Sequence, residues 1–473
     1  MKTIKSVGST RPIVFVSAIA LLSMTATLAM CLSLAVGSGW RVAWLVTAAI
    51  FGLILLLSLY QLLFKRRFEL IDFVLLTMVI GVIIIFEPFV AAVRQEGFPL
   101  PFGDTNDNSV AASTGLIVSA FFSFYTVGRL IAQRVASFDR ALAFRGVISS
   151  SSVFVFSLIP LAPLALFGGQ DIIANIQLNL LGRQSGYVAF SEGAVGTSSP
   201  ILLLMAQALP VSAVLNFFLA STAQRRTLKA AHLAMFVVIL FVSASLGGRS
   251  WIVIVVGTAA ITYLSISRRA LAEQISIALV GLMFLLSVLG WQMQNRHEGL
   301  NLDNTSGLFG FNINREVAFV AKNFDERNFV QGGTVAEKIL LPVPSYIFLV
   351  VTNPVPRMIW PSKPIEPSFA VVNLMRTGYD GLATGSNVTL SIPGRAFANF
   401  GMSGVIQAGF ALGLLASVFC RQLRQSDPTK LGHTAAVFSL VLIAANFREL
   451  QAGKWYPVLW FYFFIFIHKF KTA

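Results

Sequence analysis

Residues 42–64 read VAWLVTAAIFGLILLLSLYQLLF, a run of 23 residues without a charge, and the next three residues are Lys65, Arg66 and Arg67. The hydrocarbon core of a bilayer is about 30 Å thick, and a helix needs about 20 apolar residues to cross it. The run is therefore long enough to span a membrane, and the basic triplet marks one end of the span. It decides the fold class, because similar runs recur along the chain.

These recurring runs explain the composition of the whole chain. Of its 473 residues, 56% are hydrophobic and 12% are charged, whereas a soluble domain has about 25% charged residues. We therefore exclude a soluble globular enzyme and a disordered chain. The two cysteines, Cys31 and Cys420, are too few for a disulfide scaffold, and we predict that they do not pair. The fold class is an all-α polytopic membrane protein, with twelve transmembrane spans expected at about 12–36, 42–64, 70–93, 111–132, 146–168, 200–223, 230–247, 250–267, 271–292, 401–420, 433–448 and 455–468.

The distribution of Lys and Arg predicts the orientation of these spans. A cytoplasmic N-terminus puts 20 basic residues, among them Arg129, in cytoplasmic segments and six in the short outer segments, in agreement with the positive-inside rule. The cytoplasmic segments also hold five acidic residues, among them Asp72, and so carry the whole net charge of +15. The excess thus indicates topology and no nucleic-acid partner. We expect both termini inside, with an uncleaved signal anchor at residues 12–36.

Two outer segments are long. One covers residues 169–199 and the other residues 293–400, which is 108 residues. A loop of the second length is unusual unless it is functional. We therefore divide the chain into residues 1–292 with nine spans and the smaller loop, the large periplasmic loop 293–400, and residues 401–473 with the last three spans.

Several common chemistries lack their sequence motif. The chain has no GxxxxGK[ST] phosphate-binding loop, no HExxH or Cys/His cluster for zinc, and no GxSxG nucleophile elbow. It also has no Asp-x-Asp pair of the kind that metal-dependent sugar transferases use. These absences argue against ATP-driven transport by this chain, a zinc site, an α/β-hydrolase and a metal-dependent sugar transferase, and we expect no cofactor.

The first candidate motif is Gly247-Gly248-Arg249-Ser250, between the seventh and eighth predicted spans. The two glycines allow a tight turn, and Arg249 follows at the outer membrane boundary. Charges near the membrane core are costly and usually functional, so Arg249 is a candidate anion ligand. The alternative is a turn residue whose side chain reaches out to the interface.

The second motif lies in the large loop and reads Pro354-Val355-Pro356-Arg357-Met358-Ile359-Trp360-Pro361-Ser362-Lys363-Pro364. Four prolines in eleven residues exclude a helix and favour an extended path. Arg357 and Lys363 are donors for phosphate or sugar oxygens, and Trp360 suits the membrane interface. The alternative is a rigid loop with solvated charges.

Two further stretches follow. Residues 385–395 and 399–404 (GSNVTLSIPGR and NFGMSG) contain small hydroxylated residues that either bind sugar hydroxyls or satisfy backbone groups in turns. Asn446-Phe447-Arg448-Glu449 lies at the outer end of the eleventh predicted span. Its adjacent Arg448 and Glu449 are either a self-neutralising structural pair or a phosphate ligand beside a base.

In this order, GGRS, PRMIWPSKP, NFGMSG and NFRE resemble the oligosaccharide repeat-unit polymerase family, which includes O-antigen, enterobacterial-common-antigen and exopolysaccharide polymerases. The resemblance covers about residues 240–460. It implies a membrane glycosyltransferase similar to the C type, in which helices bind the lipid and outer loops bind the sugars. It also implies transfer of a glycan from undecaprenyl pyrophosphate to a second lipid-linked repeat unit, at the periplasmic face of the bacterial inner membrane and without metal.

Fixed arginines suit this reaction, because the leaving pyrophosphate gains negative charge. We assign Arg249, Arg448 and Arg357 to the pyrophosphate, with Arg183 and Lys363 as further candidates. The acceptor hydroxyl needs orientation and a general base, for which Glu449, Glu316 and Asp380 are candidates ahead of His297. Trp360 and Arg395 complete the set expected to contact substrate. A separate chain-length-regulating membrane protein is a conceivable partner.

Three alternatives remain open from the sequence. A transporter or flippase of lipid-linked oligosaccharide fits twelve spans, although transporters often have matching halves, and only one half here carries a large outer loop. An O-antigen ligase would use the same donor with a lipid A-core acceptor and yield lipopolysaccharide. A scaffold subunit of an envelope assembly machine would show no turnover.

Overall fold

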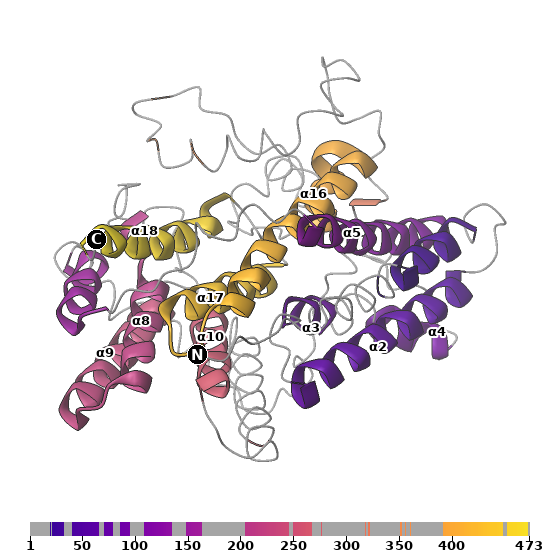
Figure 1. Ribbon diagram of the computed structural model, residues 1–473. Coiled ribbons are helices and arrows are strands. Elements are labelled where there is room, and N and C mark those ends of the chain that lie inside the picture. Colours follow the sequence, from indigo (N-terminus) through magenta and orange to yellow (C-terminus); the bar gives the residue numbers. More distant parts are fainter. Residues whose placement is uncertain are drawn as a thin grey trace, which may run out of the picture.

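The computed structural model describes eleven labelled elements and several shorter stretches of the chain (Figure 1). The described residues are 19, 21–32, 40–65, 71–78, 86–94, 108–134, 148–162, 204–245, 249–266, 276, 317, 320–321, 351, 355, 360, 391–447 and 452–471. The elements are α2 (Trp40–Lys65), α3 (Ile71–Met78), α4 (Phe86–Val93), α5 (Asn108–Arg134), α8 (Leu209–Thr222), α9 (Arg226–Ser245), α10 (Arg249–Ile266), α16 (Ile392–Gln425), α17 (Leu431–Ala445), the 3-10 helix η8 (Ala452–Trp455) and α18 (Tyr456–Lys471).

All regular secondary structure in these ranges is helical, as predicted. Five helices are long and apolar enough to cross a membrane, and they are Trp40–Gln61, Ser109–Ala132, Leu204–Thr222, Arg226–Ser243 and Phe400–Gln425. Shorter apolar helices cover Leu21–Leu32, Ser150–Ala162, Trp251–Ile266, Leu431–Ala445 and Tyr456–His468. Each of these ten helices overlaps a predicted span. Of the ninth predicted span, 271–292, only Ser276 is described, so the count of twelve stays a prediction.

The helices form two groups that meet at α17. In Figure 1, α2, α3, α4 and α5 lie on one side, and α8, α9 and α10 on the other. Helix α17 packs against α3 and α16 of the first group and against α8, α10 and α18 of the second. All fourteen residues from Leu431 to Ala444 are buried, which is why this helix is apolar on every side. A helix of that kind belongs at the centre of a bundle.

The closest helix pair is α5 with α16. A Cβ atom on Gly409 would collide with the backbone carbonyl of Phe121, and one on Gly413 with the carbonyl of Tyr125. The two contacts advance by four residues on both helices, so α5 and α16 run in the same direction. Gly128 of α5 makes a similar close approach, because a Cβ atom on it would collide with the carbonyl of Phe410 in α16. Small residues of this kind allow helix backbones to approach in a membrane, where packing replaces the hydrophobic effect.

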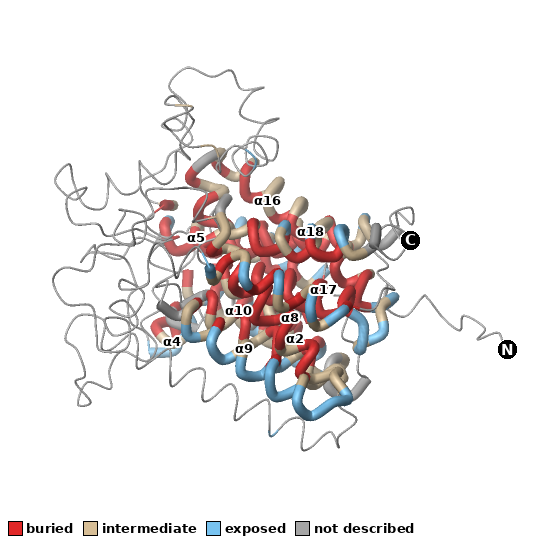
Figure 2. The backbone as a smooth tube through the Cα atoms, turned by 90° about the vertical axis from the view of Figure 1, so that its left-hand side faces the viewer, coloured by how far each residue is buried: buried red, intermediate tan, exposed pale blue. Residues whose placement is uncertain are grey.

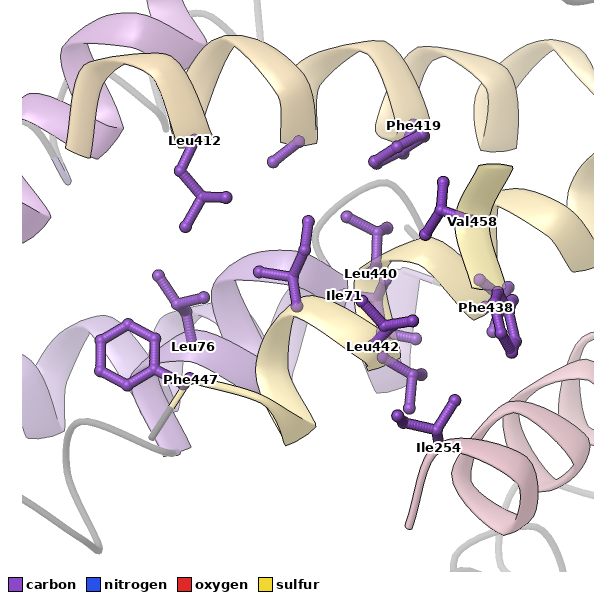
Figure 3. Packing of buried hydrophobic residues seen from close by; sticks show 14 of the residues in the cluster. Ile71, Leu76, Ile254, Leu412, Phe419, Phe438, Leu440, Leu442, Phe447 and Val458 are labelled. Carbon is purple, nitrogen blue, oxygen red and sulfur yellow. The ribbon is translucent and has the colours of Figure 1, made fainter. Parts of the chain in front are cut away.

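Apolar side chains fill the space between α16, α17 and α3. Figure 3 shows Leu412 and Phe419 of α16 directed toward Leu440 of α17, with Leu76 of α3 nearby. Phe419 and Leu76 are 5% and 1% exposed. This core fixes α16 along much of its length.

Other helices keep large apolar side chains on the outside. Leu56 of α2, Phe241 of α9 and Phe466 of α18 are all more than half exposed, and Figure 2 marks such exposed residues in pale blue. Surfaces of this kind would aggregate in water, but they suit contact with lipid. The long apolar helices and these faces are compatible with a membrane protein.

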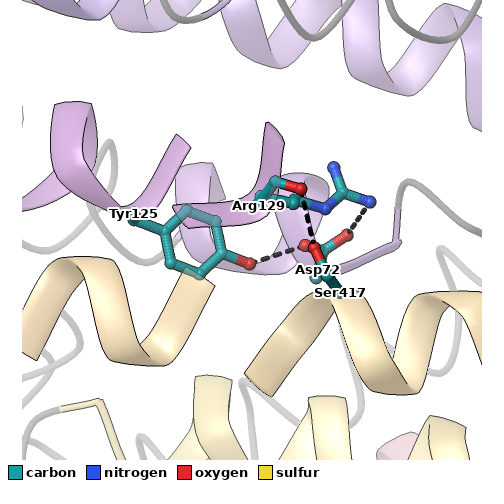
Figure 4. Close-up of polar contacts among 4 residues, drawn as sticks. All are labelled: Asp72, Tyr125, Arg129 and Ser417. Atoms are coloured by element: carbon teal, nitrogen blue, oxygen red, sulfur yellow. Dashed lines mark hydrogen bonds and ion pairs between the residues drawn. The ribbon is translucent and has the colours of Figure 1, made fainter. Parts of the chain in front are cut away.

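A charged group lies inside the first helix group (Figure 4). Arg129 Nη2 of α5 is 3.0 Å from Asp72 Oδ1 of α3, and the Tyr125 hydroxyl donates to Asp72 Oδ2 at 2.6 Å. Ser417 Oγ of α16 donates to the carbonyl oxygen of Arg129 at 3.0 Å. We call Asp72, Tyr125, Arg129 and Ser417 the Asp72 cluster. It ties three helices together.

The Asp72 cluster adds a feature that the sequence prediction lacks. From the sequence, Asp72 and Arg129 are assigned to the cytoplasmic segments, and the structure buries both side chains among helices, at 3% and 1% exposure. Each neutralises the other, because an unpaired charge in an apolar interior is costly. A count of net charge cannot detect this buried ion pair, because one Asp and one Arg together add zero to the net charge.

The turn from α16 to α17 keeps its charges in the open. The Asp427 carboxylate accepts hydrogen bonds from the Thr429 N–H at 2.8 Å and from the Thr429 hydroxyl at 2.6 Å. These bonds favour the charged carboxylate, and they lower the pKa of Asp427 below its ordinary value. Lys430 follows in the same turn and is exposed.

Candidate functional site

The described residues include three of the ten predicted site residues. Arg395 lies in the first turn of α16 and is 5% exposed. Trp360 is half-buried. Arg249 is the first residue of α10, and only its backbone is described. Outside the described residues lie Arg183, Glu316, Arg357, Lys363, Asp380, Arg448 and Glu449, and also His297.

Arg395 is positioned by a capped helix start. Ser391 is the N-cap of α16, and its Oγ accepts a hydrogen bond from the Gly394 N–H at 3.3 Å. Its carbonyl oxygen accepts one from the Arg395 N–H at 2.8 Å. Pro393 fits the first turn, where a helix needs no N–H from that residue. Helix α16 thus begins nine residues before the predicted span at 401, within the segment that we assigned to the large loop.

The start of α16 is joined to the end of α17. The Ile392 N–H donates to the Phe447 carbonyl oxygen at 2.8 Å. The Phe447 ring is fully buried and meets the Phe121 ring edge to face, with centroids 5.7 Å apart. Phe447 thus lies beside the turn that carries Arg395, and in the sequence it directly precedes Arg448.

A third segment reaches the same place. Val317 is fully buried, and a Cβ on Gly394 would lie 3.5 Å from Val317 Cγ2. Val317 therefore adjoins the first turn of α16, and in the sequence it directly follows Glu316.

Helix α10 points its first residue toward this end of the bundle. Trp251 of α10 is 6% exposed, and the Lys454 Nζ of η8 lies 5.1 Å from the centroid of its indole ring. Deeper in the bundle, a Cβ on Gly257 would lie 3.2 Å from Val441 Cγ1 of α17. The start of α10 thus adjoins η8, and its middle adjoins α17.

We call Trp251, Ser391, Arg395, Phe447 and Lys454 the helix-end cluster. It includes two cations, Arg395 and Lys454, and the start of two helices. The N–H groups of the first turn of α16 are already bonded to Ser391 and Phe447, so the two cations and the partial positive charge of the helix starts are what suit an anionic ligand here. Cation–π contact with Trp251 also holds Lys454 in place.

The hydroxylated residues of 385–395 and 399–404 were predicted either to bind sugar hydroxyls or to satisfy backbone groups. The structure shows backbone hydrogen bonds for Ser391 and Ser403. Ser391 caps α16, and Ser403 Oγ donates to the Phe400 carbonyl at 2.7 Å. Between them α16 breaks, because Phe400 (φ −146°, ψ 18°) and Gly401 (φ 60°, ψ −154°) leave the helical region. A positive φ of this size favours glycine. Both serines thus satisfy backbone groups, and NFGMSG forms a break in a helix.

Two residues of the helix-end cluster were not predicted from the sequence. Lys454 and Trp251 each lie at the start of an apolar run, and a basic residue and a tryptophan at such boundaries are a usable signal. Their contact depends on how α10 packs beside η8, which one sequence does not reveal.

Within the part of the chain that the structure describes, no group of three or more His, Cys, Asp or Glu side chains could hold a metal ion. Cys31 and Cys420 are both free, as predicted.

Comparison with known proteins gives no match: no family model matches the sequence, no curated protein matches it, and no solved structure matches it.

Proposed function

We propose that the chain is a membrane glycosyltransferase that polymerises undecaprenyl-pyrophosphate-linked oligosaccharide repeat units into a surface polysaccharide. In this proposal it lies in the bacterial inner membrane with twelve spans and both termini in the cytoplasm. Residues 293–400 form a periplasmic loop, and the architecture is similar to that of C-type glycosyltransferases. A chain-length-regulating membrane protein is a proposed further partner.

One observation carries most of the support. The Ile392–Phe447 hydrogen bond and the Val317–Gly394 contact bring three separate segments together. The Trp251–Lys454 contact joins the start of α10 to η8, seven residues after Phe447 in the sequence. Each of these segments carries or directly adjoins in sequence a residue that we assign to the reaction, namely Arg249, Glu316, Arg395 and the pair Arg448–Glu449. This supports a common site for candidates that are up to 200 positions apart in the sequence.

The proposed step breaks the bond between C1 of the donor sugar and the pyrophosphate oxygen. The acceptor hydroxyl oxygen forms the new bond to C1, and its proton passes to a carboxylate, for which Glu449, Glu316 and Asp380 are the candidates. Undecaprenyl pyrophosphate leaves with the bonding electrons. Arg249, Arg357 and Arg448 stabilise its charge, assisted by Arg183 and Lys363. Fixed guanidinium groups are effective here, because they need no reorganisation as the charge develops.

Arg395 and Trp360 are proposed to contact the substrate beside these groups. Arg395 is buried at the capped start of α16, so the orientation of its guanidinium is restricted before a ligand arrives. Preorganisation of this kind lowers the entropic cost of binding.

A transporter of lipid-linked oligosaccharide is the second candidate, and the Asp72 cluster favours it. Ionisable residues inside membrane helices often mark ion or proton pathways. The pairing of Asp72 with Arg129 at 3.0 Å also has a purely structural explanation, which is why we rank transport below polymerisation.

The test is incubation of the purified full chain with a synthetic lipid-linked repeat unit, followed by sizing of the glycan. A polymerase gives a ladder of longer lipid-linked chains. An O-antigen ligase lengthens nothing until a lipid A-core acceptor is added. A transporter or a scaffold leaves the substrate at its original size, and that result would overturn the proposal.

A further inference from the structure

The turn between α8 and α9 carries three basic side chains within five residues. Arg225, Arg226 and Lys229 are all exposed, and none of them forms a hydrogen bond or an ion pair through its side chain with the described part of the chain. This sets the turn apart from other described cations. Arg129 is paired with Asp72, and Arg421 donates to the carbonyl oxygen of Ala132.

The described helices around this turn contain no carboxylate. Helices α10, α17 and α18, which pack on α8 and α9, contain no Asp or Glu in their sequences, and neither do α8 and α9 themselves. The helix Ser150–Ala162, which meets the pair through a hydrogen bond from Asn216 Nδ2 to Ser157 Oγ at 2.9 Å, contains none either.

An apolar stripe continues from the basic turn along α9. Leu233, Val237 and Phe241 follow one another at intervals of four residues, so they share one face of the helix. They are 48%, 41% and 55% exposed. Little of the apolar window of α9 is buried within the bundle, and Figure 2 views the molecule from the side on which α9 lies.

We propose that this surface binds an anionic phospholipid. Its phosphate lies against Arg225, Arg226 and Lys229, and one acyl chain lies along Leu233, Val237 and Phe241. We call these six residues the α9 lipid site. Along α9 the basic residues come first and the apolar stripe follows, which matches a phospholipid, whose charged headgroup is followed by its acyl chains. An acidic peptide would satisfy the basic turn but leave the apolar stripe unoccupied. The inference is independent of the proposed function.

The test uses native mass spectrometry of the full chain in detergent micelles, with phosphatidylglycerol and phosphatidylcholine of identical acyl chains supplied in equal amounts. The first variant replaces all three cations (Arg225→Gln, Arg226→Gln, Lys229→Gln). The matched control replaces two exposed cations around the α16–α17 turn (Arg424→Gln, Lys430→Gln), where Asp427 supplies an opposite charge. If the triple variant is not monodisperse, the single substitutions Arg226→Gln and Lys229→Gln take its place.

Each basic residue at an anionic surface contributes about fivefold to binding. We therefore expect the wild type to retain phosphatidylglycerol over phosphatidylcholine by at least about tenfold. The triple variant loses this preference, each single substitution lowers it about fivefold, and the control keeps it. The proposal is overturned by a wild type with no preference, or by equal losses in the triple variant and the control. It is also overturned if glycerol phosphate or a polyglutamate peptide competes as well as the lipid, because the apolar stripe then contributes nothing.

Discussion

The two ends of α16 differ in the charged side chains that lie near them. At one end, Ser417 joins the Asp72 cluster, where a carboxylate and a guanidinium are buried 3.0 Å apart. At the other end, Arg395 and Lys454 belong to the helix-end cluster. Asp72 and Asp427 are the only carboxylates whose side chains the structure describes, and both lie toward the Ser417 end.

We interpret the Ser417 end as structural and assign the proposed functional role to the Arg395 end. The Ser417 end is neutral, and glycine packing fixes α16 to α5 just beside it, so it holds the helix in place. The Arg395 end contains a helix break at Gly401 and the starts of two helices. It also holds the cations Arg395 and Lys454, and positive charge beside helix starts suits a ligand with negative charge. Substitutions at the two ends should therefore differ in kind.

The largest effect is expected for two arginines that we assign to the pyrophosphate, and on activity alone. Arg249→Ala and Arg448→Ala should each reduce polymerisation about 1,000-fold, because loss of one preorganised charge donor removes stabilisation of the leaving group. Arg→Lys at either position should also lower activity, since Lys lacks the two-pronged geometry of Arg. Gel analysis of labelled glycan measures both. Arg424→Ala, at the opposite end of α16, is the control, and normal polymer length in the Arg249 and Arg448 variants would remove their assigned role.

The Asp72 cluster should respond in stability. Asp72→Ala leaves Arg129 buried without its carboxylate, and we expect a loss of about 3 kcal/mol. The double variant Asp72→Ala with Arg129→Ala should recover part of it, because no uncompensated charge remains. Unfolding in mixed micelles followed by circular dichroism measures both. Equal losses in the single and double variants would show that charge pairing is not the cause.

A smaller loss is expected where α5 meets α16. Gly413→Ala forces a methyl group against the Tyr125 carbonyl, and overpacking of this kind costs about 2 kcal/mol. Gly52→Ala in α2 is a matched control, because a Cβ there meets nothing within 4 Å. The same unfolding measurement applies. If both variants lose the same stability, the close approach of the two helices is not what stabilises them.

The smallest effect should come from the cap of α16. Ser391→Ala removes the acceptor for the Gly394 N–H, which costs about 1 kcal/mol. Because the cap holds Arg395, activity should also fall. Ser221→Ala is the control, since the Ser221 hydroxyl only donates to the Phe217 carbonyl within one helix. Unchanged stability and polymer yield in Ser391→Ala would mean that the helix start needs no cap.

Much of the fold was readable from the sequence, because an apolar run such as residues 42–64 has few alternatives to a helix in a membrane. The described helices confirm helical structure within eleven of the predicted spans. The Asp72–Arg129 pair was not readable, since hydropathy does not reveal which helices pack together. The break at Gly401 was missed because the sequence of NFGMSG allows both turn and ligand roles.

The candidate site was predicted in part. The motifs at Arg249, Arg395 and Arg448 were found from their residue types and order, and the described backbone brings their segments to one end of the bundle. The roles of their side chains stay predictions, as do those of Glu316, Arg357 and Asp380. Lys454 could be recognised as a candidate only from its contact with Trp251 in the structure.

The most direct measurement counts the undecaprenyl pyrophosphate released by the purified chain during incubation with lipid-linked repeat unit. If the helix-end cluster stabilises a pyrophosphate leaving group, one undecaprenyl pyrophosphate is released for each glycosidic bond formed, and Arg249→Ala stops both processes together. Release of no undecaprenyl pyrophosphate by the wild type, or movement of intact substrate across a vesicle membrane instead, would contradict the account.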